Sequence, residues 1–149
     1  LHSEVVYIVM NDAKNLFSDN EDLFAKRFCG DGKTTHIALL DYRDSQLMSL
    51  LGRKNGHDKD YYTNKIKNVI EYHIEKYKQQ YPDHHIELHL NPNFNTMAVL
   101  LTEHYAMISL YRLALGKTTV PHMTLKKGGK EFDTINKDIE KLCCGKLTS

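Results

Sequence analysis

The sequence of 149 residues has no tryptophan, only three prolines and only three cysteines. The cysteines, Cys29, Cys143 and Cys144, are odd in number and include no CxxC pair, which argues against a disulfide framework. This usage is typical of a reducing, cytoplasmic compartment. Apolar runs such as "MAVLLT" are far shorter than the roughly 18 residues that a membrane span requires, and the first residues do not form a signal peptide.

An excess of charge of one sign is also lacking, because 20 basic residues face 19 acidic ones and the net charge is +1. No global field attracts nucleic acid or an anionic membrane, so any anion site must be local. The length fits one domain. Because the chain starts at Leu1 and not at methionine, we expect residues 1–149 to be a single sensory domain from a longer chain. The missing segment would supply any membrane anchor or output domain.

Hydrophobic patterning predicts an α/β (α+β) fold: a mixed, largely antiparallel sheet of about six strands with helices packed on it. Apolar, β-branched runs predict strands over residues 4–10, 35–40, 85–90, 96–102, 106–112 and 120–126. The tight connection before residue 106 predicts an antiparallel hairpin. A capping-box pattern at Ser18 and Glu21 predicts a helix over residues 19–28, and "RDSQLMSLLG" predicts a helix that ends at Gly52. The clearest pattern is a long amphipathic helix of about six turns that ends before "YPD", and a final helix follows "KKGGK".

The motif "GKTT" occurs at Gly32 and again at Gly116, each time before a strand that contains a histidine. If those strands were neighbours in one sheet, Lys33 and Lys117 would lie close together. The segment "KKGGK" places lysines and two glycines before a helix, and a helix amino terminus with exposed backbone N–H groups binds phosphate. The alternative is a strand-to-helix turn with solvated lysines. The predicted ligand-binding residues are Lys33, Thr34, Thr35, Arg112, Lys117, Thr118, Thr119, His122, Lys126, Lys127 and Lys130.

No catalytic residue is assigned from these motifs. Neither "GKTT" is a Walker phosphate loop, because Arg27 and Tyr111 stand where that loop requires its first glycine. His122 and Lys126 face the same side of a strand, but a spacing of four residues puts their Cα atoms about 13 Å apart, too far to share one phosphate.

The histidines also suggest no metal site or other cofactor. "HHIELH" spaces His85 and His89 by four residues, which joins two imidazoles at one metal on a helix but separates them on a strand. No cysteine lies nearby to complete a site. These histidines are expected on the surface or at an interface.

From about residue 34 to residue 142 the chain resembles the degenerate phospholipase D-like domains of bacterial regulatory and defence proteins. The resemblance rests on "HIALLDYRDS", "YYTNKIKNVIEYHIEKY", "IELHLNPNFNTMAVLLTEHYAMISLYR" and "PHMTLKKGGKEFDTINKDIEKL". Active members of that fold carry a His-x-Lys motif on a strand, and none of the predicted strands of this chain has one. The resemblance therefore implies a sensory domain that has kept a phosphate-binding sheet edge without a catalyst. A chain of this size, expected to lack an N-terminal segment, also resembles the soluble cyclic-oligoadenylate-binding half of small membrane effectors in type III CRISPR defence.

We therefore expect a non-enzymatic sensory domain for a phosphate-bearing nucleotide second messenger, of the cyclic oligoadenylate type, in prokaryotic antiviral signalling. A symmetric homo-oligomer could build a site for a cyclic ligand. One alternative is a divergent phosphodiesterase or nuclease with His122 as its nucleophile, assisted by His36. Another is a protein-interaction module in which the long helix or a sheet edge mediates assembly.

Overall fold

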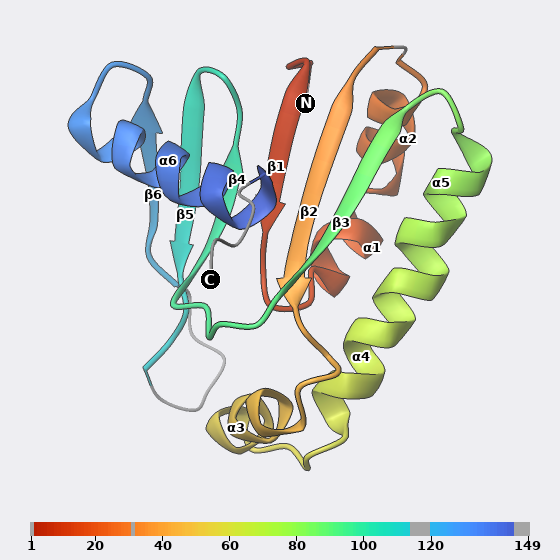
Figure 1. Ribbon diagram of the computed structural model, residues 1–149, viewed down its shortest axis with the longest axis vertical. Helices are drawn as coiled ribbons and strands as arrows, with labels where there is room; N and C mark the ends of the chain where they lie inside the picture. The colour runs from red at the N-terminus through yellow and green to blue at the C-terminus, as the bar shows by residue number, and fades with distance from the viewer. Residues whose placement is uncertain (1, 31, 114–119, 145–149) are drawn as a thin grey trace.

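The computed structural model describes residues 2–30, 32–113 and 120–144 of the chain. Six strands form one sheet in the order β3-β2-β1-β4-β5-β6 (Figure 1). The strands agree with the predicted ones to within two residues at either end. They are β1 (Val5–Val9), β2 (Thr34–Leu40), β3 (His85–Asn91), β4 (Met97–Leu101), β5 (Tyr105–Leu110) and β6 (His122–Lys126).

The sheet is mixed and mostly antiparallel, as predicted. β1 pairs in parallel with β2, and β2 with β3. On the other side of β1, the pairs β1–β4, β4–β5 and β5–β6 are all antiparallel. β4 and β5 form the predicted hairpin. β2 and β6 are not neighbours, because β1, β4 and β5 lie between them. The two "GKTT" segments therefore do not enter adjacent strands, and Lys117 itself lies outside the described residues.

The helices cover the two faces of this sheet and leave part of it open. They are α1 (Lys14–Asp19), α2 (Glu21–Phe28), α3 (Ser45–Asn55), α4 (Tyr61–Val69), the π-helical segment η1 (Ile70–Glu75), α5 (Lys76–Gln80) and α6 (Lys130–Cys144). α4, η1 and α5 follow one another without a break and together form the predicted long helix. No helix in the described part of the chain combines the length and apolar character that crossing a membrane requires.

Two predicted helix ends are wrong. Ser18 lies inside α1, and Asn20, which separates α1 from α2, makes no side-chain N-cap bond to α2. Its Nδ2 donates instead to the carbonyl oxygen of Leu16 in α1, at 2.8 Å. α3 continues through Gly52 to Asn55 and ends at Gly56, whose φ of 74° is left-handed. Gly52 has a different role: a Cβ there would lie 2.6 Å from the carbonyl oxygen of Asp58. A glycine at this position permits close approach of the following loop and does not end the helix.

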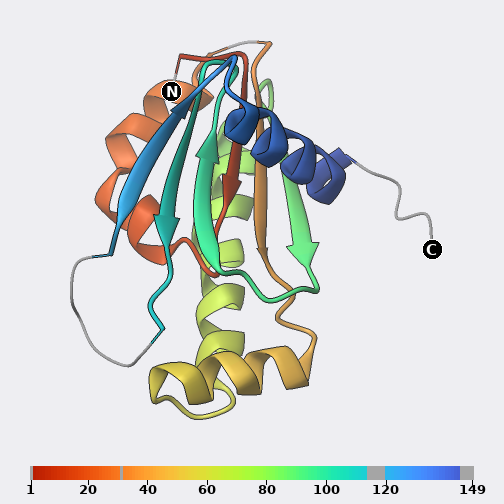
Figure 2. The ribbon, with the colours of Figure 1, turned by 90° about the vertical axis from the view of Figure 1, so that its left-hand side faces the viewer.

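Each face of the sheet has its own hydrophobic cluster. On one face, Val6, Ile8, Ile37 and Leu39 pack with apolar residues of α1 to α5, including Phe17. On the opposite face, Val9, Ala38, Val99 and Ile108 pack with α6 through Phe132, Ile139 and Cys143. Figure 2 shows α6 on the other side of the sheet from α1 and α2. Because α6 is a single helix, it does not cover that face completely.

A buried guanidinium ties α2 to the amino end of β2. Arg27, which is 2% exposed, donates from Nε to Thr35 Oγ1 at 2.8 Å. Its Nη1 and Nη2 donate to the carbonyl oxygens of Ser3 and Thr34, each at 2.7 Å. Burial lowers the pKa of Arg27 from its ordinary value. The group stays charged, because an arginine pKa starts far above neutral pH.

We expect Arg27→Met to lower the free energy of unfolding by about 1–3 kcal/mol, because buried acceptors lose their donor. Urea denaturation measures the change. Arg43→Met is the matched control, since Arg43 pairs with Asp41 at 2.8 Å on the exposed surface. An equal loss in both variants would contradict a structural role for the buried guanidinium.

A second expectation concerns acid stability. His84 is 5% exposed, its Nε2 lies 2.9 Å from Thr35 Oγ1, and burial lowers its pKa below 6.5. The folded state therefore binds fewer protons than the unfolded state. The contribution of neutral His84 to the free energy of unfolding is complete above about pH 6.5 and is lost as the pH falls toward the folded pKa. Urea denaturation at pH 7 and pH 5 should show a smaller acid loss for His84→Gln than for the wild type. A loss of equal size would exclude His84 as a source of the pH dependence.

Candidate functional site

The residues predicted to bind a ligand do not gather at one place. Lys33 and Thr34 lie at the amino end of β2, and Lys126 and Lys127 lie where β6 ends, at the same edge of the sheet. The two groups are four strand positions apart, which is about 19 Å. Arg112 and His122 lie at the opposite edge. Lys117, Thr118 and Thr119 lie outside the described residues.

The edge that carries the lysines is a weaker anion site than the sequence indicates. The hydroxyl of Thr35 is fully buried and already accepts a hydrogen bond from Arg27, so it does not face a ligand. Gly128 has the left-handed φ of 99° that the turn into α6 requires, and Lys130 begins the helix. The first turn of α6 carries Glu131 and Asp133, whose negative charges compensate the positive end of the helix.

The opposite edge of the sheet gathers the carboxyl ends of the parallel strands β1, β2 and β3. β4 is antiparallel to β1 and begins at this edge, so the β3–β4 connection crosses the ends of β2 and β1. In open α/β sheets, ligands bind outside the carboxyl ends of parallel strands.

A cavity of about 440 Å³ lies at this edge, between the β3–β4 connection and the carboxyl-terminal half of α6. Its apolar wall includes Val9, Met97 and Ile139, and its polar groups include the amides of the asparagine-rich segment. The lining residues are Val9, Leu90, Asn91, Pro92, Asn93, Phe94, Asn95, Thr96, Met97, Val99, Ile135, Asp138, Ile139, Lys141 and Leu142. This size and mixture of apolar and polar walls are typical of small-molecule sites.

Buried polar atoms without partners concentrate at the same edge. Within residues 2–30, 32–113 and 120–144, the buried side-chain atoms that lack a hydrogen-bond partner are Asn11 Oδ1, Asn95 Nδ2 and Arg112 Nη1. Thr96 accepts from the backbone of Tyr111, so the antiparallel ladder of β4 and β5 continues outward and brings Asn95 opposite Arg112. Asn95 lines the cavity, and Arg112, which is not among the lining residues, lies across the ladder from it. Buried donors without acceptors require an explanation in a folded protein.

Neighbouring side chains hold these donors in place. Asn91 Nδ2 donates to Asn95 Oδ1 at 2.8 Å, which leaves Asn95 Nδ2 as the unused donor. The hydroxyl of Tyr111 accepts from the backbone N–H of Asn11 at 2.9 Å and anchors the segment that carries Arg112. Burial raises the pKa of Tyr111 far above its ordinary value, so the phenol stays neutral.

A cation and aromatic rings lie beside the same segment. Lys54 Nζ is 5.4 Å from the ring centre of Phe94, which lines the cavity, and 6.0 Å from that of Tyr111. Of these residues the sequence predicted only Arg112. Asn91, Phe94 and Asn95 were missed, because their juxtaposition with Arg112 depends on strand order.

A larger hollow of about 680 Å³ lies between α3 and the start of α4. It is lined by polar side chains such as Gln46, Arg53 and Asp60. None of the three unpaired atoms belongs to a residue that lines it. It is a surface groove between two helices, with fewer grounds for ligand recognition.

One group of side chains has the composition of a metal site. His36, Glu87 and His89 present ligand atoms that all lie within 4.8 Å of one another. Burial lowers the pKa of both His36 and His89, and a hydrogen bond from His85 lowers that of Glu87. The sequence pattern paired His85 with His89 and did not indicate this three-residue combination, in which "HIELH" supplies Glu87 and His89 from β3 and His36 comes from the neighbouring strand β2.

The structure does not assemble the predicted His122 centre. His122 Nδ1 lies 2.6 Å from Ser109 Oγ on the neighbouring strand, at an exposed position. His36, the suggested helper, is on β2, with three strands between it and β6. The two histidines therefore cannot act on one phosphate.

Comparison with known proteins adds little to these observations. No family model matches the chain, and no curated protein does. Among solved structures, TrmBL2, an archaeal chromatin protein described as having a novel mode of DNA binding, is similar with a TM-score of 0.47 and 15% sequence identity. The similarity covers 94% of this chain and 43% of that chain, so this chain spans less than half of TrmBL2.

Proposed function

We propose that this domain binds a phosphate-bearing nucleotide in the cavity at the carboxyl edge of the parallel strands. The observation that carries the proposal is the pair of buried donors, Asn95 Nδ2 and Arg112 Nη1, that have no acceptor among the described residues. Leaving a buried donor unpaired costs about 1–3 kcal/mol, and a bound oxygen would remove that cost.

Each part of the site suits one part of such a ligand. Arg112 would pair with a phosphate oxygen, because a guanidinium binds phosphate through charge-assisted hydrogen bonds. Lys54 adds a second cation near Phe94. The side-chain amides of Asn93 and Asn95 face a base edge, and the apolar wall accepts the face of the base.

The proposed ligand belongs to the class predicted from the sequence, but its site lies at the opposite edge of the sheet from "KKGGK". Arg112 is retained, and the lysines of "KKGGK" are replaced by the asparagine-rich segment and Lys54. The cavity is built within one chain, so binding does not require a second copy. A cyclic oligonucleotide as ligand, a homo-oligomer and a role in antiviral signalling stay predictions. Because His122, the predicted nucleophile, is not among the residues that line the cavity, we propose binding without hydrolysis.

We expect a nucleotide to raise the melting temperature of the domain in a screen of mononucleotides, linear oligonucleotides and cyclic oligonucleotides. A ligand at 100 times its dissociation constant adds about 2.7 kcal/mol to the free energy of unfolding. Arg112→Met should weaken the affinity about 10- to 100-fold, since a hydrogen bond to a charged group contributes about 1.5–3 kcal/mol. Calorimetric titration measures the affinities.

Lys126→Met is the matched control, because it removes one cation at the other edge of the sheet. Asn95→Leu removes the second donor at similar size. Normal nucleotide affinity in both Arg112→Met and Asn95→Leu would exclude the cavity as the binding site. Weakened binding only in Lys126→Met would show that the nucleotide binds at "KKGGK" instead. No thermal shift with any nucleotide would contradict the proposed function and favour the interaction module.

A further inference from the structure

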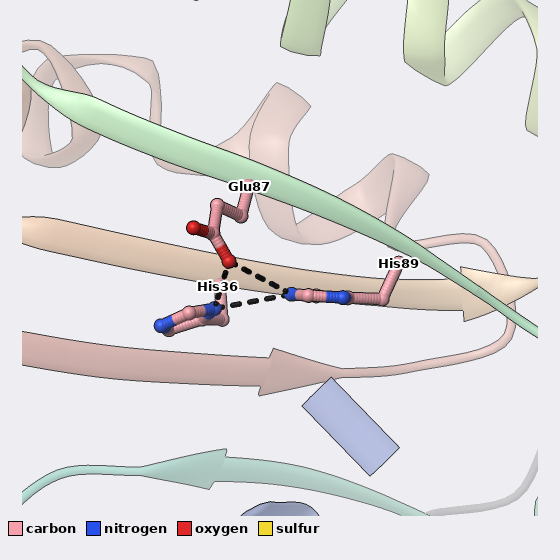
Figure 3. Close-up of side chains that lie close together, drawn as sticks. All are labelled: His36, Glu87 and His89. Carbon is pink, nitrogen blue, oxygen red and sulfur yellow. Dashed lines mark hydrogen bonds and ion pairs between the residues drawn. The ribbon is translucent and has the colours of Figure 1, made fainter. Parts of the chain in front are cut away.

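The geometry points to a metal site: we propose that His36, Glu87 and His89 bind a divalent transition-metal ion, with zinc as the first candidate. Figure 3 shows the three side chains pointing toward one another from β2 and β3. The site is separate from the nucleotide cavity in its residues, and it does not depend on the proposed function.

The backbone brings the three ligands together through strand register. His36 is directly opposite Glu87 in the parallel pairing of β2 with β3, and His89 is opposite Ala38 in the next paired position on the same face. Side chains of alternate residues point to one face of a strand, so Glu87 and His89 share the face on which His36 lies. Register therefore presents two imidazoles and one carboxylate on a single surface.

The distances between the donor atoms fit a metal ion. His36 Nδ1 is 3.0 Å from His89 Nε2 and 3.1 Å from Glu87 Oε2, and His89 Nε2 is 3.5 Å from Glu87 Oε2. A tetrahedral zinc with bonds of about 2.0–2.1 Å separates its ligand atoms by about 3.3–3.4 Å. An ion can therefore contact all three atoms after shifts of a few tenths of an ångström.

Surrounding residues orient the ligands. His85 Nε2 lies 2.5 Å from Glu87 Oε1, which leaves Oε2 to face the two imidazoles. The ring of Tyr7 stacks on His36 with centroids 4.6 Å apart and planes 9° apart, which fixes the imidazole plane. Outer partners of this kind hold ligands in the binding orientation.

The ligand set also narrows the chemistry. Two nitrogens and one oxygen suit zinc and its first-row neighbours and do not suit calcium or magnesium, which prefer oxygen ligands. Three protein ligands leave a fourth position for water or another molecule, as in zinc sites that are not purely structural. The side chains of His36, His89 and Glu87 are 10%, 21% and 39% exposed, so an ion can enter from solvent.

The test is a titration of the chelator-treated, tag-free domain with Zn²⁺ by calorimetry, and with Co²⁺ by visible absorption. We expect one ion per chain and the absorption of a low-symmetry Co²⁺ site. Glu87→Gln and His89→Gln each remove one ligand from a partly exposed position and should weaken Zn²⁺ binding by more than about 100-fold, beyond the 10- to 100-fold typical of outer partners. His85→Gln should fall within that outer range.

His104→Gln is the matched control, because His104 also pairs with a carboxylate, Glu103 at 3.8 Å, but without a third ligand. Its Zn²⁺ affinity should equal that of the wild type. Absence of one-to-one binding in the wild type, or unchanged affinity in both Glu87→Gln and His89→Gln, would overturn the site. In those cases the three side chains form only a hydrogen-bonded surface network.

Discussion

The parallel pairing of β2 between β1 and β3 is the constraint on which the rest of the structure depends. Ile37 and Leu39 must face the helices of the larger hydrophobic cluster, because both are fully buried there. A shift of the strand register by one residue would turn them to the other face and point His36 and Ala38 into the core. The apolar core thus sets the register, and that register places His36 opposite Glu87. The same pairing brings the carboxyl ends of β1, β2 and β3 to one edge of the sheet.

The two faces of the sheet differ in how completely they are covered, and this difference decides where polar chemistry can occur. Helices α1 to α5 bury one face, where polar side chains such as Arg27 and Thr35 satisfy one another. Among the described helices, α6 alone packs on the other face. On β2 and β3, the side chains of His36, His89 and Glu87 are 10%, 21% and 39% exposed. A cavity lies beside the carboxyl-terminal half of α6.

The elements of the fold could be predicted from the sequence, whereas the sites could not. Strand and helix signals are local, so the six strands and the long helix followed from periodicity. Ser18 failed as a cap because α1 already contains it, and Gly52 failed as a helix end because its small size serves a loop contact. The sites depend on neighbours distant in sequence: Asn95 with Arg112, and His36 with Glu87. The residues of "KKGGK" are contiguous, so the sequence alone favoured them as an anion site. In the fold, they lie at the opposite edge of the sheet from Arg112.

The two proposed sites share β3, and this has a thermodynamic consequence. Asn91 follows His89 by two residues, so both side chains lie on one face of the strand, about 7 Å apart. Asn91 in turn holds the amide of Asn95, which lines the cavity. A metal that fixes His89 also restricts the end of β3, and a ligand that fixes Asn95 restricts it from the other side. Any coupling between the two must be reciprocal: if the metal changes ligand affinity by some factor, the ligand changes metal affinity by the same factor.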